Sequence, residues 1–289
     1  MRLAFLGTPE FAVPVLEALA REHEVVLVVS RADRRRTRRG HLEPSPVKAA
    51  AQRLDIPTTE RVRDVVGWEV DLGVVVAFGR IIKPDVLQRV PMVNLHLSLL
   101  PRWRGAAPVQ RAILAGDHMT GVCLMSLDEG LDTGPVHGRE PAAIGDDETA
   151  DELTSRLVSL GTGLLLDHLS RGLGAGTPQT GEPIYAEKIT GDDLRLRWER
   201  PSVELLRQVR VGAAWCLFRD KRLEVVRAKP AELEREVVPG EVVRDDGEVV
   251  VGTGAGTMTL ERVKPEGRRE VAGADWVNGA RLTPGERLT

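Results

Sequence analysis

The sequence predicts an α/β protein with a Rossmann-like, mostly parallel sheet covered by helices on both faces, followed by a small OB-like β-barrel. Two apolar runs, residues 25–29 and 72–77, lack polar alternation, which is typical of strands buried on both faces of a parallel sheet. Helical periodicity separates such runs in the first half of the chain. After Gly174 the pattern changes to short alternating segments divided by turn residues, which indicates a barrel.

The composition excludes some classes of protein but does not identify the function. The 289 residues are 42% hydrophobic and 29% charged, with a net charge of −3. These values suit two globular domains and exclude a disordered chain or one that coats nucleic acid over its whole surface. Cys123 and Cys216 lie far apart in apolar contexts, so we expect free buried thiols and a cytoplasmic location. We expect no metal site, because Cys and His form no ligand cluster, and no membrane span.

The first elements form a strand, a helix and a strand. Residues 2–6 are strand-like and apolar after Arg2. They stop at a Gly-Thr-Pro turn, too early for a signal peptide, and residues 24–30 form the next strand. Six arginines then follow within residues 31–39. They are either a solvated loop or an anion-binding loop. Their place after a strand favours the second interpretation, because ligand loops of open α/β sheets lie at the carboxyl ends of strands.

The remaining elements complete two domains. We predict a catalytic domain over residues 1–188, with a linker at about 174–200, and a barrel domain over residues 201–289. The expected helices of the first domain after the basic loop begin at Pro46 and span residues 84–89, 108–115 and 149–173; its later strands span 92–97, 122–127 and 136–142. The barrel domain has a helix from Pro201 and expected strands at 214–218, 223–227, 241–244, 249–252 and 257–263.

Two glycine-containing turns bear on cofactor use. Residues 252–256, Gly-Thr-Gly-Ala-Gly, match a dinucleotide loop only superficially, because an alternating strand follows them and a phosphate cradle needs a helix there. The turn after the first strand, residues 7–10, lacks a glycine fingerprint and carries Glu10. The sequence therefore argues against a nicotinamide or flavin dehydrogenase.

One set of polar residues has coherent chemistry. Asn94 and His96 lie two apart on an alternating strand, so their side chains share one face. A carboxylate-rich loop that contains Asp132 follows the next strand, and sequential strands of a parallel sheet often neighbour each other. An amide, an imidazole and an orienting carboxylate can transfer an acyl group to an amine without a Ser or Cys nucleophile. The alternative is a structural histidine, which is the more common role of a lone His.

The sequence also resembles a known family. Residues 94–101, Asn-Leu-His-Leu-Ser-Leu-Leu-Pro, and residues 102–110 resemble the folate-dependent formyltransferases, especially those that act on methionyl-tRNA. The resemblance extends over nearly the whole chain and includes residues 5–11, 44–48, 121–135 and 185–188. The sequence departs from the family at four places: a short segment at 57–71, Leu97, a compressed junction at 211–215 and an unusually arginine-rich loop. These departures put loop shapes in question but leave the three polar residues unchanged.

The resemblance implies a reaction and its participants. The formyl donor would be 10-formyltetrahydrofolate, no metal would take part, and the acceptor would be the α-amine of initiator methionyl-tRNA. Asn94 would hold the formyl oxygen, His96 would manage protons and Asp132 would orient His96. The folate would bind at residues that follow two neighbouring strands: Val76, Ala77, Phe78, Ser98, Leu99, Leu100 and Pro101. The enzyme is expected to be a monomer.

Basic residues would then bind the tRNA. The family has a basic loop after the second strand, and Arg38 is the closest match to its critical arginine, with Arg35 and Arg36 beside it. A second basic cluster precedes and enters the barrel, and its expected RNA contacts are Arg195, Arg197, Arg207, Arg210 and Lys221. The alternative for this cluster is an ordinary solvated surface.

Two other functions fit parts of this pattern. An N-formyltransferase acting on a nucleotide-linked amino sugar would share Asn94, His96 and Asp132 but would need a nucleotide pocket instead of basic surfaces. A non-catalytic RNA-binding protein on a former enzyme scaffold would not require the intact polar set. The sequence favours the tRNA enzyme over both.

Overall fold

The computed structural model describes residues 1–35, 41–233 and 235–289. The chain forms two compact units, each described by itself below. The N-terminal unit comprises Met1–Val109, His118–Ile144 and Glu152–Glu187. The C-terminal unit comprises Gln110–Asp117, Gly145–Asp151 and Lys188–Thr289, so two short segments from the first half of the sequence pack with the second.

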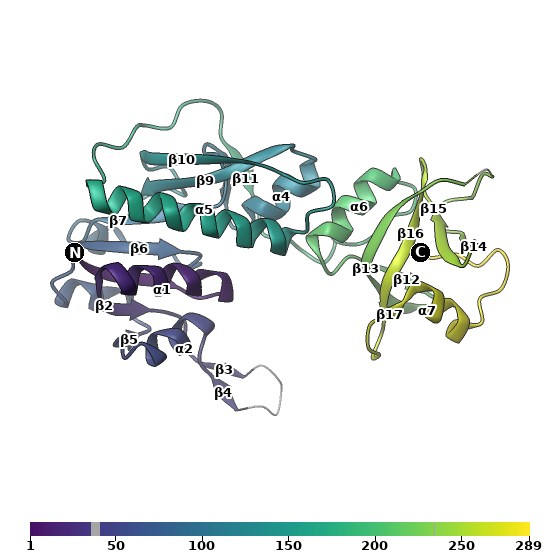
Figure 1. Ribbon diagram of the computed structural model, residues 1–289, viewed down its shortest axis with the longest axis horizontal. Helices are drawn as coiled ribbons and strands as arrows, with labels where there is room; N and C mark the ends of the chain where they lie inside the picture. Colours follow the sequence, from purple (N-terminus) through teal and green to yellow (C-terminus); the bar gives the residue numbers. More distant parts are fainter. Residues whose placement is uncertain (36–40, 234) are drawn as a thin grey trace. The chain divides into compact units, whose positions relative to one another are not determined.

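A seven-stranded mixed sheet forms the centre of the N-terminal unit, in the order β10-β9-β7-β6-β1-β2-β5 (Figure 1). Five strands run parallel, whereas β9 and β10 are antiparallel at one edge. The strands are β1 (Arg2–Gly7), β2 (Glu24–Val29), β5 (Thr58–Thr59), β6 (Leu72–Val76), β7 (Met92–His96), β9 (Met119–Ser126) and β10 (Val136–Ala143). β1, β2 and β6 are almost wholly buried, as their continuous apolar runs predict.

Helices pack against this sheet. They are η1 (Glu10–Ala12), α1 (Val13–Glu22), α2 (Pro46–Arg53), η2 (Val62–Gly67), α3 (Pro84–Leu87) and α5 (Ala150–Arg171). Ser45 caps α2 by accepting a hydrogen bond from the Lys48 backbone N–H at 3.1 Å. Gly161 of α5 lies directly against the Leu95 side chain of β7, so α5 covers the face of β7 opposite to Asn94 and His96.

A second, two-stranded sheet was not predicted. Residues 102–105, expected as a loop, form β8 (Arg102–Gly105), which pairs in parallel with β11 (Ile184–Ala186). Gly105 is required at this junction, because its φ is +118° and a Cβ there would lie 2.8 Å from the Ala186 carbonyl oxygen. Such a short strand with a partner some eighty residues away leaves no local periodicity to recognise. The hairpin of β3 (Arg34–Arg35) and β4 (Leu42–Glu43) was also not predicted.

The C-terminal unit is built on an antiparallel sheet in the order β12-β13-β16-β15-β14, with β17 paired to β16. Its strands are β12 (Trp215–Phe218), β13 (Lys221–Ala231), β14 (Val242–Asp245), β15 (Glu248–Gly252), β16 (Thr257–Pro265) and β17 (Val271–Ala272). Its helices are α6 (Ser202–Val211), α7 (Gly273–Ala280) and most of α4 (Pro108–Ala115). β17 and α7 were not predicted, whereas the five longer strands were.

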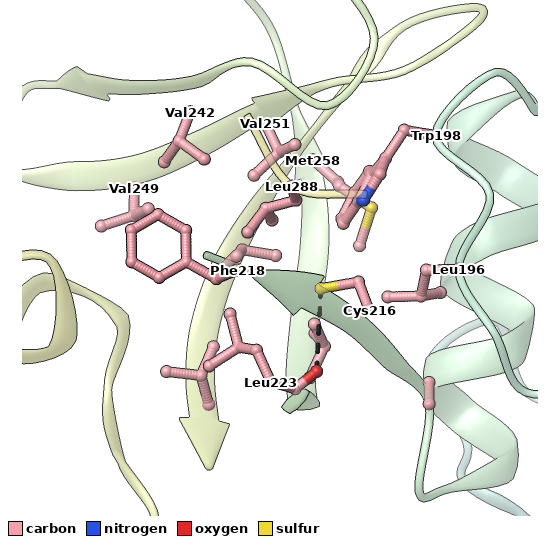
Figure 2. Packing of buried hydrophobic residues seen from close by; sticks show 14 of the residues in the cluster. Leu196, Trp198, Cys216, Phe218, Leu223, Val242, Val249, Val251, Met258 and Leu288 are labelled. Carbon is pink, nitrogen blue, oxygen red and sulfur yellow. Dashed lines mark hydrogen bonds between the residues drawn. The ribbon is translucent and has the colours of Figure 1, made fainter. Parts of the chain in front are cut away.

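The last residues join the two edge strands of this sheet. The Val242 N–H of β14 donates to the Glu286 carbonyl at 3.0 Å, and Leu217 of β12 exchanges backbone hydrogen bonds with Thr289 at 2.6 and 2.9 Å. Leu288 is buried in the core between them, together with Trp198, Cys216 and Phe218 (Figure 2). The sheet therefore curls around an apolar core, and the expected fold class of a mixed α/β sheet followed by a barrel-like domain is confirmed. In the described ranges, no helix is long and apolar enough to cross a bilayer.

Candidate active site

Strand β7 presents the two polar residues that the period-2 pattern predicted. His96 is 5% exposed, and its Nε2 lies 2.8 Å from the backbone carbonyl oxygen of Trp103. Asn94, two residues earlier on the same face, is half-buried. The strand therefore fixes the imidazole inside the protein and leaves the amide partly accessible, as a group that contacts a substrate requires.

Asp132 reaches His96 from the loop between β9 and β10. Its Oδ2 lies 3.6 Å from His96 Nδ1 and accepts a hydrogen bond from the Gly105 backbone N–H at 2.8 Å. β9 neighbours β7 as expected, but the expected parallel direction was wrong, because β9 runs antiparallel to β7 and ends beside Val93, away from His96. The loop between β9 and β10 nevertheless brings Asp132 to His96, so the same two side chains meet through a different topology.

The contacts of His96 assign different tasks to its two ring nitrogens. A carbonyl oxygen can only accept, so Nε2 carries a proton and donates it to Trp103. Nδ1 is then the atom that takes up or releases a proton, and Asp132 faces it. A positive charge that develops on the ring during a reaction would lie beside this carboxylate, and opposite charges attract.

Three residues of this region have left-handed backbone conformations although none is glycine. The φ angles are +47° at Ala77, +65° at Trp103 and +51° at Asp132. Such conformations are strained for L-residues and persist only when the surrounding contacts hold them. Trp103 supplies the carbonyl for His96, and Asp132 supplies the carboxylate, so two strained residues place the two partners of one imidazole.

The residues predicted to bind folate flank this site, but most of their side chains face the protein interior. Val76, Phe78, Ser98 and Leu100 are each at most 3% exposed. Leu100 packs with Cys123, Met125 and Val136, and the Ser98 hydroxyl donates to the Arg102 carbonyl at 2.6 Å. Leu99 lies against Gly121, whereas Ala77 is exposed and Pro101 is partly exposed. A ligand at this edge would therefore meet main-chain groups rather than these side chains.

Sequence reasoning missed two members of the site, Arg104 and Gln179. Gln179 lies in the segment that was interpreted as a linker, and its side-chain amide contacts the backbone of the Asp132 loop. Arg104 donates to Gln179 from β8. The only signal was position, because Gln179 stands a few residues before the Tyr185–Lys188 stretch that carries part of the resemblance.

The predicted RNA contacts of the N-terminal unit are only partly within the described residues. Arg36 and Arg38 lie outside them. Arg35 is exposed on β3, paired in the hairpin with Leu42. Arg31, two residues after the end of β2, donates to the Gly79 carbonyl at 2.9 Å and so links the start of the basic segment to the loop after β6.

Basic side chains of the C-terminal unit gather around an aromatic ring. The guanidinium carbons of Arg195 and Arg222 lie 5.4 and 4.8 Å from the ring centroid of Trp215, within cation–π range. Lys221 and Arg197 are exposed, and Arg197 lies 3.9 Å from Asp192. We call Arg195, Arg197, Trp215, Lys221 and Arg222 the basic cluster of the C-terminal unit.

The other two predicted cations of this unit have internal contacts. Arg210 donates to the carbonyls of Glu148 and Gly145 at 2.9 and 2.7 Å, and burial lowers the pKa of its guanidinium. The Arg207 guanidinium lies against Gly116. Arg210 is thereby committed to the 145–148 loop, so the basic cluster defined above is the better RNA candidate.

Comparison with known proteins places this geometry in a family. The formyl transferase model matches residues 1–169, and the model of the formyl transferase C-terminal domain matches residues 188–281. The chain belongs to the formyl transferase family. Its Asn94, His96 and Asp132 all lie within the first matched region.

Relatives in this family match over their full lengths. The methionyl-tRNA formyltransferase of Thermus thermophilus is 43% identical, covering 100% of this chain and 99% of the relative. That of Clavibacter sepedonicus is 41% identical, covering 96% and 97%. Among solved structures, the N-formyltransferase of Helicobacter canadensis in complex with folinic acid and dTDP-3-aminofucose has a TM-score of 0.67 at 17% identity, covering 89% of this chain and 98% of that one. This last likeness concerns the fold alone.

Proposed function

We propose that this protein transfers the formyl group of 10-formyltetrahydrofolate to the α-amine of methionyl-initiator tRNA, which yields N-formylmethionyl-tRNA for translation initiation in the cytoplasm. The observation that carries the proposal is the identity of about 40% to methionyl-tRNA formyltransferases over both units of the chain. The contact of His96 with Asp132, and the place of Asn94 on the same face of β7 as His96, support it chemically. We propose that the enzyme acts as a monomer.

Asn94 and His96 divide the work of the reaction. The half-exposed amide of Asn94 donates a hydrogen bond to the formyl oxygen, which gains negative charge as the amine attacks. Nδ1 of His96 accepts the proton that the attacking amine must lose and returns it to the departing nitrogen. Asp132 holds the imidazolium while it carries that proton. An α-amine has a pKa of about 8, so a neutral fraction exists near pH 7 and a strong base is unnecessary.

The proposed folate contacts fit the exposed main chain beside the site. A pterin presents a mixed edge of hydrogen-bond donors and acceptors, which backbone N–H and C=O groups can read. Ala77 offers such groups, since it is exposed and its left-handed conformation turns the backbone away from the end of β6. The other proposed folate-site residues support this exposed main chain. Most of their side chains pack inward, and Pro101 is partly exposed beside it; the inward-packing residues are Val76, Phe78, Ser98, Leu99 and Leu100. The bound donor would supply the activated formyl group.

The basic cluster is proposed to bind the tRNA backbone. The exposed Arg222 and the partly buried Arg195 beside a half-buried Trp215 combine phosphate attraction with an aromatic face. The arginine-rich segment that begins at Arg31 is proposed to reach the acceptor end. Of its three predicted RNA contacts, Arg35 lies within the described residues, whereas Arg36 and Arg38 lie outside them.

One assay tests the proposal. The purified protein is incubated with 10-formyltetrahydrofolate and charged initiator tRNA, and the released amino acid is analysed for N-formylmethionine. Formylmethionine that depends on both substrates and disappears in His96→Asn supports the proposal. Absence of this product, together with formylation of a nucleotide-linked amino sugar, would assign the chain to the other branch of the family.

A further inference from the structure

We infer that Gln179 is a positioning residue for the formyl-transfer reaction, holding Asp132 in the conformation that serves His96. This inference rests on the proposed function for its kinetic consequences. Its structural part, that Gln179 holds the Asp132 loop, stands on the contacts alone. Gln179 reaches the site from the segment that precedes β11, far from the other site residues in sequence.

The side-chain amide of Gln179 spans the loop on both sides of Thr133. Nε2 donates to the Asp132 carbonyl at 2.8 Å and to the Gly134 carbonyl at 2.9 Å, so both of its protons are used. Oε1 accepts from Arg104 Nη2 at 2.7 Å and Nε at 3.1 Å. One side chain therefore fixes two carbonyls of the loop and is itself fixed by a guanidinium.

The backbone conformation of Asp132 is one that outside contacts help to hold. Its φ of +51° is left-handed, which is uncommon for residues other than glycine, although Asp adopts it more readily than most. The carboxylate is restrained by the Gly105 N–H, and the carbonyl of the same residue is restrained by Gln179. With both ends held, the carboxylate stays directed at His96 Nδ1.

Strand β8 contacts each of the three side chains in this arrangement: His96, Gln179 and Asp132. Three consecutive residues act in turn: the Trp103 carbonyl accepts from His96, the Arg104 side chain binds Gln179, and the Gly105 N–H binds Asp132. Because β11 pairs with β8, the chain that carries Gln179 is anchored to the same strand. The His96 imidazole and the Asp132 carboxylate are thus both held by hydrogen bonds to the same short strand.

Because Gln179 positions Asp132, a substitution of Gln179 should slow turnover without weakening the binding of either substrate. The side-chain hydrogen bonds of Gln179 go to Arg104 and to the backbone of the Asp132 loop, and not to Asn94 or to residues 76–78, so donor and acceptor binding should persist. A displacement of a reacting group by about 1 Å costs on the order of 100-fold in rate. We therefore expect kcat to fall while both KM values stay nearly constant.

Gln179→Glu is the most informative variant. The side chain keeps its shape and its Arg104 contact, but it presents an oxygen, not an N–H, to the two carbonyls. Thr180→Glu is the matched control, because it places the same charge on the adjacent exposed residue. Arg104→Lys tests the other end of the chain of contacts, since it keeps the charge and removes the fork of two donors.

The kinetic test first establishes turnover of the unchanged protein. Gln179→Glu should then lower kcat by about 10- to 100-fold with each KM within about threefold, whereas Thr180→Glu should be unchanged. In an Asp132→Asn background, Gln179→Glu should cost less than about threefold, because the carboxylate that it positions is gone. Independent, multiplying losses, or a rise in KM that accounts for the whole effect, would overturn the inference.

A second measurement needs no substrate. Hydrogen exchange at residues 127–136 should accelerate in Gln179→Glu, and less so in Arg104→Lys, but not in Thr180→Glu. Unchanged exchange in Gln179→Glu would overturn the inference even for an active enzyme. If the unchanged protein does not formylate tRNA but exchange responds as expected, the proposed function fails and the structural role of Gln179 stands.

Discussion

His96 Nδ1 lies 3.6 Å from Asp132 Oδ2, at the opposite end of the imidazole from the Trp103 carbonyl that Nε2 contacts at 2.8 Å. The distance to Asp132 is longer than an ordinary hydrogen bond. It suits an electrostatic partner that matters most when the ring is doubly protonated. Since His96 is buried, a charge formed there depends on Asp132 rather than on water.

Removing the charge of Asp132 tests this relationship. Asp132→Asn should lower kcat by about 100- to 10,000-fold, the range typical of lost general acid–base assistance, because the imidazolium loses its only close carboxylate among the described contacts. Steady-state kinetics with both substrates gives the measurement. Glu129→Gln removes an exposed charge from the same loop and should leave kcat unchanged. Similar losses in the two variants would contradict the assignment.

Asn94 is expected to act on the formyl oxygen only as charge develops. Asn94→Ala should therefore lower kcat by about 100- to 1,000-fold while the Kd for a folate analogue changes little. Quenching of intrinsic tryptophan fluorescence by the analogue measures that Kd. A variant that loses folate affinity in proportion to its activity would show that Asn94 serves ground-state binding instead.

The basic cluster makes a prediction about salt. Arg222→Gln and Arg195→Gln should each raise the KM for tRNA several-fold, preserve kcat, and reduce the slope of log KM against log salt by about one. Lys229→Gln provides the control, because Lys229 is already paired with Glu248 at 2.6 Å. If all three variants behave alike, the cluster carries only general surface charge.

The C-terminal residues are expected to stabilise the barrel-like unit. Leu288→Ala should lower its free energy of unfolding by about 2–5 kcal/mol, because it leaves a cavity beside Trp198 where the last residues join β12 and β14. Urea unfolding followed by tryptophan fluorescence gives the value. Val238→Ala, at a position 48% exposed, should change it by less than about 0.5 kcal/mol. Equal effects would mean that the closure contributes nothing.

Asp193 predicts a pH dependence of stability. Hydrogen bonds from Thr190 and Arg111 lower the pKa of Asp193 from 3.8 to about 2. The ionised form is therefore favoured by folding, so its stabilisation is complete above pH 4 and is lost as pH falls from about 4 to 2. The difference in unfolding free energy between the unchanged protein and Asp193→Asn should shrink over that interval. Asp192→Asn, at an exposed neighbour, should show no such trend.

Much of the fold follows from local patterns. The buried runs at β2 and β6, the proline-started helix α2 and the long helix α5 all appear where the sequence predicted them. The sequence did not predict three other elements. β8 and β11 are very short, and α7 begins at a glycine and lacks a clear start signal. The antiparallel direction of β9 is likewise a property of the whole sheet and not of its residues.

Residue spacing alone placed Asn94 and His96 on one face of a strand, because alternation follows from the local geometry of an extended backbone. Tertiary structure decided which nitrogen of His96 exchanges protons, because the Trp103 carbonyl and the Asp132 carboxylate arrive from separate segments in strained conformations. It also brought Gln179 to the Asp132 loop across 47 positions of sequence. Such contacts depend on long-range packing, and the local periodicity of a sequence carries no information about it.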